Sequence, residues 1–172
     1  MINRFAAMHE IKSVIELGCG DGAQLALATY PSYVGVDVSP TAIALCQERF
    51  AADPTKSFVL HDPMETADLG QLPNAELALS LDVIYHLVED VVFERYMAAL
   101  FRAATRFVII YSSDMMGESD SPHVRHRVFT RWVERRMSGW ELLEWIPNRY
   151  PYQGDYRTGS FSDFFIYKKV GG

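Results

Sequence analysis

The first residues whose spacing indicates chemistry are three closely spaced glycines, Gly18, Gly20 and Gly22. They follow the apolar run 14–17 and precede an apolar pattern that is typical of a helix. Glycine permits a turn with positive φ and the close approach of a ligand, and a following helix begins with unpaired N–H groups. This order of strand, tight turn and helix start predicts a binding site for a nucleotide-like cofactor.

Asp37 is the second such residue, because it lies nineteen positions after Gly18 at the end of the apolar run 33–36. An acid at about 20 residues' distance from a glycine turn is placed to bind ribose hydroxyls. As a structural alternative, Asp37 would only precede the helix that Ser39 and Pro40 begin. The spacing favours the ribose.

The glycine stretch fits two cofactor classes. The pattern Gly18-x-Gly20-x-x-Ala23 suits a nicotinamide dinucleotide, whereas Glu16-x-Gly18-x-Gly20-x-Gly22 resembles motif I of the class I S-adenosylmethionine-dependent methyltransferases. Two further motifs of that family are matched downstream, Asp37-Val38-Ser39-Pro40 for the second and Asp62 after Phe58-Val59-Leu60 for the third. The resemblance extends from about Val14 to Ile110.

The resemblance implies S-adenosylmethionine as cofactor and gives each acid a role. Glu16 would bind the cofactor's ammonium group, Asp37 its ribose and Asp62 the exocyclic amine of adenine; alternatively, Glu16 only ends a strand and Asp62 caps a turn. Pro63 departs from the family's pattern because proline has no N–H for the adenine ring, so Met64 is expected to donate instead. The expected cofactor-binding residues are Glu16, Gly18, Cys19, Gly20, Gly22, Asp37, Val38, Asp62, Met64 and Leu81.

Histidines supply the candidate general bases. His86 lies where related methyltransferases often have a histidine, next to Tyr85, an expected substrate-binding residue, but a structural role is equally consistent with its position. His123 and His126 lie in a segment that also holds five arginines and one acid: Arg125, Arg127, Arg131, Arg135, Arg136 and Glu134. This basic segment is either a solvated helix face or a site where Arg125 and Arg127 bind an anionic acceptor while a histidine acts as base.

No metal site is expected, because the five histidines show no H-x-x-x-H pairing beside a third ligand. Cys19 and Cys46 are too few and too far apart for a disulfide framework or a C-x-x-C site, so we expect reduced thiols.

The elements that would position these residues alternate between strands and helices. Together they predict one α/β domain over 1–172, with a Rossmann-like, doubly wound, mostly parallel sheet, a C-terminal antiparallel hairpin and helices on both faces. The expected strands are 13–17, 33–37, 56–60, 76–80, 107–111, 140–146 and 161–169; the expected helices are 2–11, 25–30, 39–50, 90–104 and 129–137. The core spans 13–111, the loop 112–123 and the final helix and hairpin 128–170. The segment 112–127 leaves the ligand-binding edge and is expected to form a lid with a basic end.

Composition narrows the class of protein. A chain of 172 residues with 49% hydrophobic and 22% charged residues is typical of a single globular domain. The net charge of −6 argues against a general nucleic-acid binder. The sequence has neither a signal-peptide pattern nor a run of 18 apolar residues, so we expect a cytoplasmic protein without a membrane partner.

Methyl transfer is the leading function, and two alternatives remain. A nicotinamide-dependent oxidoreductase would need a second mononucleotide-binding half, whose length the hairpin occupies; a non-catalytic S-adenosylmethionine-binding protein would bind without turnover. The sequence 80–83 shows no Asn-Pro-Pro-Tyr or Asp-Pro-Pro-Tyr after the fourth strand, which argues against methylation of nucleic-acid adenine. We therefore expect O-methylation of a small metabolite, a sugar derivative or a carrier-bound intermediate.

Overall fold

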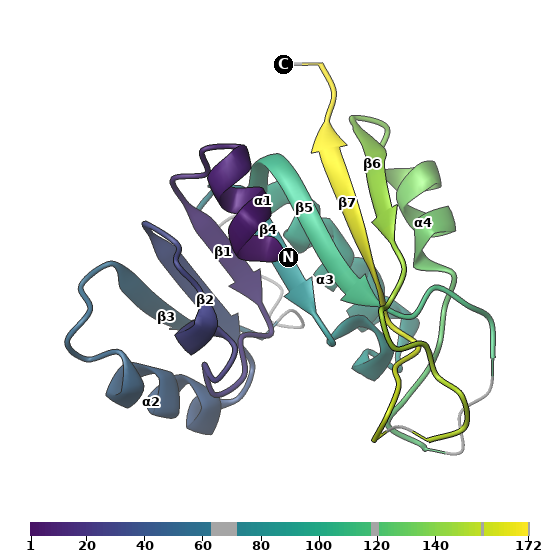
Figure 1. Ribbon diagram of the computed structural model, residues 1–172, viewed down its shortest axis with the longest axis horizontal. Helices are drawn as coiled ribbons and strands as arrows, with labels where there is room; N and C mark the ends of the chain where they lie inside the picture. Colours follow the sequence, from purple (N-terminus) through teal and green to yellow (C-terminus); the bar gives the residue numbers. More distant parts are fainter. Residues whose placement is uncertain (63–71, 118–120, 156, 172) are drawn as a thin grey trace.

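The computed structural model describes residues 1–62, 72–117, 121–155 and 157–171 (Figure 1). Its centre is one seven-stranded sheet in the order β3-β2-β1-β4-β5-β7-β6. Strands β1 to β5 are parallel, and β7 is antiparallel to both β5 and β6, which confirms the predicted fold class. The strands are β1 (Val14–Leu17), β2 (Tyr33–Asp37), β3 (Lys56–Leu60), β4 (Ala75–Leu81), β5 (Ala104–Ser112), β6 (Trp140–Ile146) and β7 (Asp163–Lys169).

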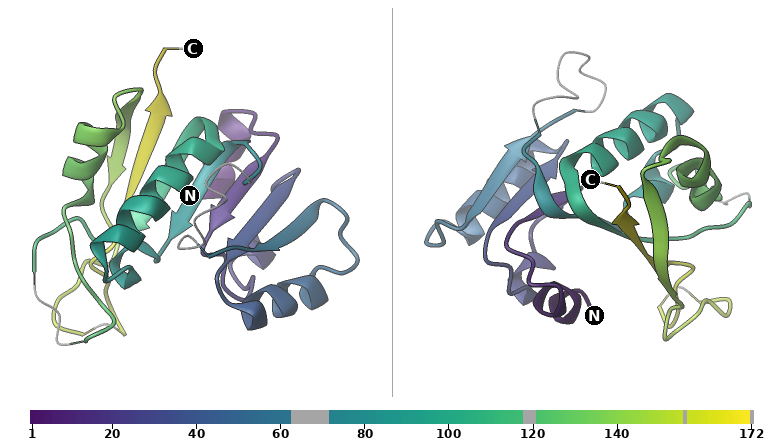
Figure 2. Two further views of the ribbon diagram at one scale, coloured as in Figure 1. Left: turned by 180° about the vertical axis from the view of Figure 1, so that it is seen from behind. Right: turned by 90° about the horizontal axis from the view of Figure 1, so that it is seen from above.

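Helices cover both faces of the sheet. The helix α1 lies on one face, and α3 and α4 lie on the other (Figures 1 and 2). The helices are α1 (Ile2–Met8), α2 (Pro40–Arg49), α3 (Asp90–Ala103) and α4 (Phe129–Arg136), with short 3₁₀ helices η1 (Leu25–Leu27) and η2 (Ile84–His86). Among the described residues, no helix combines the length and the apolar character needed to cross a membrane.

Strand β4 shows how the sequence divides the core between the two faces. Leu77 and Leu79 pack in a cluster with Phe5 of α1, whereas Ala78 packs in a second cluster with Met97 of α3. Successive strand residues point to opposite faces, so a central strand covered on both sides needs apolar residues at nearly every position. The apolar residues on both faces of β4, interrupted only by Glu76 and Ser80, suit its place in the middle of the sheet.

The helix expected at 25–30 is only the 3₁₀ turn η1. Ala28 is already extended, with φ −97° and ψ 154°, and Pro31 follows before β2 begins. The side chain of Asn3 of α1 forms hydrogen bonds with backbone groups of this segment: it donates to the carbonyl of Leu27 and accepts from the N–H of Thr29. A segment this short does not offset the cost of nucleating a helix, and the bonds from α1 favour the turn.

The start of α3 also differs from the expectation. Glu89 is the N-cap and Asp90 the first helical residue, so Asp90 is not the cap that the sequence predicted. At its other end α3 stops at Ala103, and Ala104 continues directly as β5, three residues earlier than expected. Pairing of Ala104 with Ala75 of β4 draws this residue into the sheet.

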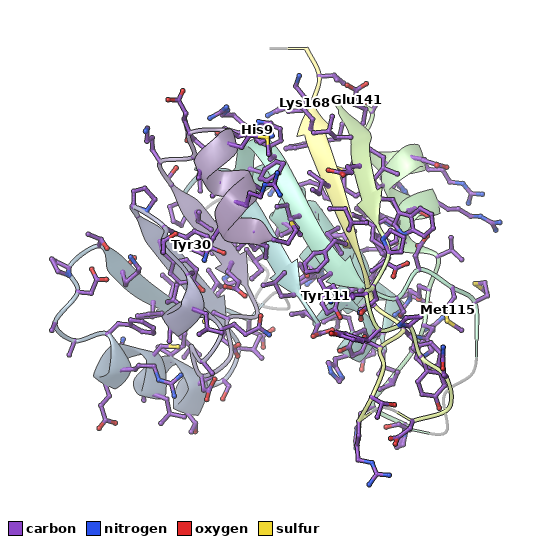
Figure 3. All side chains as sticks on the ribbon, in the orientation of Figure 1. His9, Tyr30, Tyr111, Met115, Glu141 and Lys168 are labelled. Carbon is purple, nitrogen blue, oxygen red and sulfur yellow. The ribbon has the colours of Figure 1, made fainter. Side chains whose placement is uncertain are left out.

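The carboxyl ends of β1, β2 and β4 meet at one edge of the sheet, at the bottom of Figure 1. The connections that follow β5 and β6 lie beyond the same edge, at the bottom of Figure 1. Tyr111 at the end of β5 anchors the second connection, because its hydroxyl accepts a hydrogen bond of 2.7 Å from Asn148 (Figure 3). Ligands of open α/β sheets bind at this edge, so both connections are placed to shape a site.

Candidate active site

The glycine loop after β1 is a turn that its glycines make possible. Gly18, Gly20 and Gly22 have φ values of +81°, +57° and +74°, a region that other residues rarely adopt. The N–H groups of Gly18 and Cys19 both donate to the carbonyl of Val36 in β2, at 2.7 and 3.0 Å. The loop is therefore fastened to the neighbouring strand as well as to its own.

The three glycines leave space in different ways. A Cβ on Gly18 would lie 2.4 Å from Val83, and one on Gly22 would lie 2.8 Å from Phe50 of the segment after α2. A Cβ on Gly20 would meet no protein atom within 4 Å. Gly18 and Gly22 thus serve close packing of the protein, whereas the space at Gly20 is open to a ligand.

Asp37 at the end of β2 is held in place by backbone donors. Its Oδ2 accepts from the N–H of Gly20 and its Oδ1 from the N–H of Ser39, both at 2.9 Å. Each carboxylate oxygen has a second lone pair, so Asp37 can still accept hydrogen bonds from a diol. The carboxylate that the sequence assigned to ribose is oriented before any ligand binds.

A cavity of about 570 Å³ lies beside Asp37 at the carboxyl edge. Val38 contributes an apolar side chain that is 60% exposed, which suits contact with a flat ring. His61 was missed by the sequence analysis; its Nε2 is buried and has no hydrogen-bond partner among the described residues. The lining includes four of the expected cofactor residues and others besides: Gly18, Asp37, Val38 and Asp62, with His61, Asp82, Val83 and His86.

Glu16 lies on the other face of β1, in a smaller cavity of about 270 Å³ that Leu81 and Tyr30 also line. The Glu16 side chain is 5% exposed, and its Oε2 accepts a hydrogen bond of 2.6 Å from Tyr33. Burial raises the pKa of Glu16 from 4.5 to about 7, and the bond from Tyr33 opposes this rise. No cation pairs with Glu16 among the described residues, and a buried carboxylate of this kind can receive an ammonium group. The role expected for Glu16 stays a prediction.

Other expected cofactor residues have different surroundings. The thiols of Cys19 and Cys46 both point toward the carbonyl of Gly20, at 3.8 and 3.2 Å. Burial raises the pKa of both thiols, so they stay protonated. Met64 lies outside the described residues, and its expected role stays a prediction.

A second cavity, of about 740 Å³, adjoins the first. Its lining shares Asp82 and His86 with the 570 Å³ cavity, so the two spaces meet at these residues. Sequence reasoning missed the part of its wall that comes from the connection after β6, far along the chain: Gly159, Ser160, Phe161 and Ser162. Tyr85 and His126, which were expected here, also line it, together with Ser113.

Asp82 lines both cavities, and its backbone conformation is one that residues other than glycine rarely adopt. Its φ is +59°, and it is held by its N–H to the carbonyl of Tyr111 and by Oδ1, which accepts from Tyr85 and Ser162. Residues in this region cost on the order of 1 kcal/mol or more and persist where the surroundings determine them. The bonds draw strands β4 and β5 and the segment before β7 together at the site.

The three candidate bases are placed differently. His86 Nδ1 lies 3.2 Å from the backbone carbonyl of His123, and His126 Nδ1 lies 2.7 Å from Ser113 Oγ. His86 and His126 line the 740 Å³ cavity, whereas His123 is not part of that wall; His86 and His123 are both exposed. Burial lowers the pKa of His126 below its ordinary 6.5, so this imidazole is neutral at neutral pH.

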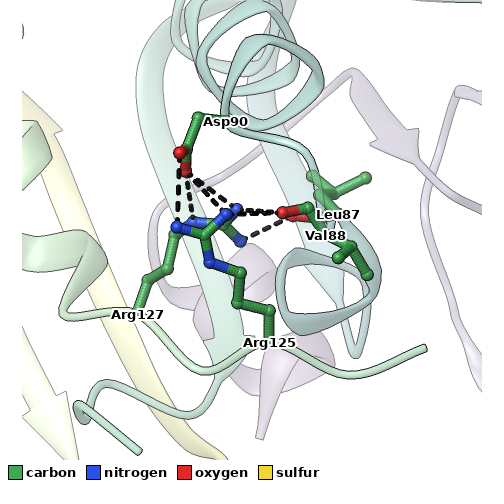
Figure 4. A network of polar contacts seen from close by, with 5 residues as sticks. All are labelled: Leu87, Val88, Asp90, Arg125 and Arg127. Atoms are coloured by element: carbon green, nitrogen blue, oxygen red, sulfur yellow. Dashed lines mark hydrogen bonds and ion pairs between the residues drawn. The ribbon is translucent and has the colours of Figure 1, made fainter. Parts of the chain in front are cut away.

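Arg125 and Arg127 do not line the 740 Å³ cavity; both are bound to Asp90 (Figure 4). Each guanidinium lies 3.1 Å from Asp90 Oδ1, and both donate to the carbonyl of Val88 just before α3. The hydrogen bond from Arg127 is the main reason that the pKa of Asp90 is lowered. These contacts fasten the basic segment to α3, and substrate binding by the two arginines stays a prediction.

Comparison of the sequence with known protein families identifies the domain. Residues 14–106, more than half of the chain, match the family described as "Methyltransferase domain". The chain belongs to this methyltransferase family. No curated protein matches the sequence.

Solved structures of methyltransferases have the same fold. The methyltransferase domain of a bacterial Hen1, "CtHen1-C", is 19% identical, with a TM-score of 0.74 over 99% of this chain and 95% of that one. Magnesium protoporphyrin IX methyltransferase from Synechocystis PCC 6803, solved with bound S-adenosylmethionine, is 15% identical, with a TM-score of 0.68 over 98% and 76%. The small RNA methyltransferase HEN1 is 16% identical, with a TM-score of 0.71 over 99% of this chain and 25% of that one.

S-adenosylmethionine is the cofactor of this methyltransferase domain. The residues of the chain fit it: the open space at Gly20, the oriented carboxylate of Asp37 and the unpaired Nε2 of His61 all lie at the carboxyl edge. The described residues contain no group of three or more metal-ligating side chains that could hold a metal ion.

Asp37 gives the first prediction. The variant Asp37→Ala should bind S-adenosylmethionine about 10- to 100-fold more weakly, because charge-assisted hydrogen bonds are typically worth roughly 1.5–3 kcal/mol. Calorimetric titration measures the change, and Asp37→Asn is the matched control because it keeps one acceptor oxygen. Unchanged affinity in folded Asp37→Ala would rule out the ribose assignment.

The raised pKa of Glu16 gives a second prediction. A carboxyl group with a folded-state pKa of about 7 and an unfolded value of 4.5 stabilises the fold below pH 4.5, and this stability is lost as the pH rises through 7. Between pH 5 and 8.5 the ligand-free wild type should lose about 2–3 kcal/mol relative to Glu16→Gln, measured by denaturant unfolding. Equal pH dependence of the two proteins would contradict the burial of an unpaired Glu16.

Proposed function

We propose that this domain transfers a methyl group from S-adenosylmethionine to a hydroxyl of a small acceptor bound in the 740 Å³ cavity. The observation that carries the proposal is that this cavity meets the 570 Å³ cofactor cavity at Asp82 and His86. The bound cofactor supplies a methyl group activated by its sulfonium. The chain then has to bind both molecules, align them and exclude water.

Ring-shaped side chains surround the acceptor cavity. The rings of Tyr85 and His86 lie 4.5 Å apart between centroids, and those of His126 and Phe161 lie 5.5 Å apart. Phe161 is itself packed on Tyr152 at 4.0 Å. Flat apolar walls favour an acceptor with a planar or largely apolar portion. Small metabolites, sugar derivatives and carrier-bound intermediates that carry such a portion fit the site.

Of the two candidate bases that line the cavity, His86 and His126, His86 is the better placed. The carbonyl of His123 can only accept, so the 3.2 Å contact requires the proton of a neutral His86 to be on Nδ1. The lone pair of Nε2 is then free to take the proton of an acceptor hydroxyl in either cavity that His86 lines. His126 can do the same only in the tautomer whose Nδ1–H donates to Ser113.

The fold alone does not identify the acceptor. The similar structures include a magnesium protoporphyrin IX methyltransferase and a small RNA methyltransferase, which act on very different molecules. The choice of a small acceptor is supported by the aromatic residues that line the cavity and by the net charge of −6.

The test begins with binding and continues with turnover. Calorimetric titration with S-adenosylmethionine, S-adenosylhomocysteine and NAD should show binding of the first two only; binding of NAD instead would favour an oxidoreductase. A screen of metabolite extract with methyl-labelled cofactor should then yield a labelled product. Cofactor binding without any labelled product would favour the non-catalytic alternative.

His86 provides the third prediction. With an acceptor in hand, His86→Gln should lower kcat about 10²–10⁴-fold while the affinity for S-adenosylmethionine changes little, because a base acts only in the transition state. His123→Gln is the informative comparison, since it keeps the carbonyl that orients His86. A loss at His123 as large as that at His86, or none at His86, would contradict this role.

A further inference from the structure

A groove of about 460 Å³ lies between α3 and α4, outside the two cavities of the methyltransferase site. Five of its lining residues are arginines, and only two are acids, Asp90 and Glu94. The arginines are Arg125, Arg127, Arg131, Arg135 and Arg136. In a chain with a net charge of −6, this groove is a local concentration of positive charge.

The arginines of the groove fall into two groups. Arg125 and Arg127 are neutralised by Asp90 (Figure 4). Arg131, Arg135 and Arg136 of α4 are exposed and make no ion pair with any residue in the described part of the chain. The first pair is therefore structural, and the three on α4 are available to a ligand.

Helix geometry sets the spacing of the available arginines. Arg131 and Arg135 are one turn apart on α4, so their Cα atoms are separated by about 6 Å along the axis. Like charges at this spacing destabilise a helix by roughly 0.2–0.5 kcal/mol per pair. An anion that contacts both side chains would remove this repulsion.

Trp132 adds an independent sign of a missing acceptor. Trp132 lines the groove, and its buried indole Nε1 has no hydrogen-bond partner among the described residues. The ring itself is fixed by an edge-on contact with Phe93 of α3, at 5.8 Å between centroids. A buried donor without a partner typically costs on the order of 1–3 kcal/mol, which a ligand oxygen would recover.

The groove adjoins the acceptor cavity. His126 lines both spaces, one on each side of the basic segment. A molecule with its reacting hydroxyl in the ring-walled cavity could therefore extend past His126 and place a second part against α4. The groove accordingly selects for what is attached to the acceptor, not for the reacting group.

We propose that the groove binds the phosphoryl group of a phosphorylated acceptor, through Arg131, Arg135 and Arg136 with the indole N–H of Trp132. Guanidinium groups bind phosphate oxygens in bidentate pairs, and a phosphoryl group offers three acceptor oxygens to several donors at once. This proposal deepens the methyl-transfer function and rests on it. The phosphoryl group can belong to a free metabolite or to the end of a nucleic-acid strand, and the experiment separates these sources.

The test measures binding of two probes to the whole chain, inorganic pyrophosphate by calorimetry and a short 5′-phosphorylated single-stranded oligonucleotide by fluorescence anisotropy. The variant Arg131→Gln/Arg135→Gln should bind whichever probe the wild type binds at least 10-fold more weakly. The matched control Arg4→Gln/Lys12→Gln removes the same charge in and after α1, on the other face, and should leave the affinity unchanged. Trp132→Phe, which removes the N–H but keeps an aromatic ring, should weaken binding by a smaller factor.

The outcomes are distinct. If pyrophosphate binds and the oligonucleotide binds weakly, the groove is assigned to a free phosphorylated metabolite. If the oligonucleotide binds tightly and this binding loses its salt dependence in the α4 variant, the groove is assigned to the end of a nucleic-acid strand. Binding of neither probe, or equal losses in the α4 variant and its control, overturns the proposal. Affinity for S-adenosylmethionine, measured on the same proteins, reports on the methyltransferase site separately and should be unchanged in the α4 variant.

Discussion

The site depends on the hydrogen bonds that fasten the glycine loop to the end of β2. The N–H groups of Gly18 and Cys19 share the carbonyl of Val36, and the N–H of Gly20 donates to Asp37. These bonds couple the glycine loop to the carboxylate of Asp37, so that the two cannot move independently. They are possible because β1 and β2 are adjacent and parallel, which brings both carboxyl ends to the same edge.

From this edge the remainder of the site extends across β4. Asp82 adopts its left-handed conformation where β4 ends, and its side chain accepts hydrogen bonds from Tyr85 and from Ser162 just before β7. One carboxylate thus joins the end of β4, beside the 570 Å³ cavity, to the connection after β6 that lines the 740 Å³ cavity. The basic segment contributes His126 to the lining of the 740 Å³ cavity and is held by Asp90 at the start of α3. Its arginines are divided by these contacts into a structural pair and an exposed row on α4.

Several expectations from the sequence concern local or periodic features, and these agree with the structure. The positive φ at Gly18, Gly20 and Gly22 follows from their residue type, and Ser39 caps α2 by accepting from the N–H of Ala42 at 3.2 Å. Alternation and continuous apolar runs predicted the mostly parallel sheet and its hairpin, because burial on one or both faces determines which positions must be apolar. The errors occur where a distant segment intervenes: α1 holds the turn at η1 through Asn3, and the basic segment takes the Asp90 side chain that was expected to cap α3.

The sequence by itself therefore determined the fold class, the glycine loop and the carboxylate that accompanies it, because each is encoded within a short stretch or a simple period. Only the tertiary structure decided the 740 Å³ cavity, whose wall combines segments far apart in the sequence: Asp82, Tyr85, His86, Ser113, Ser121, Pro122, Val124, His126 and residues 159–162. It also decided that His86 Nδ1 lies 3.2 Å from a carbonyl 37 residues away in the sequence, and that Arg125 and Arg127 pair with Asp90. The physical reason is that hydrogen bonds and ion pairs act over a few ångströms in space, and no pattern along the chain records which distant segments come that close.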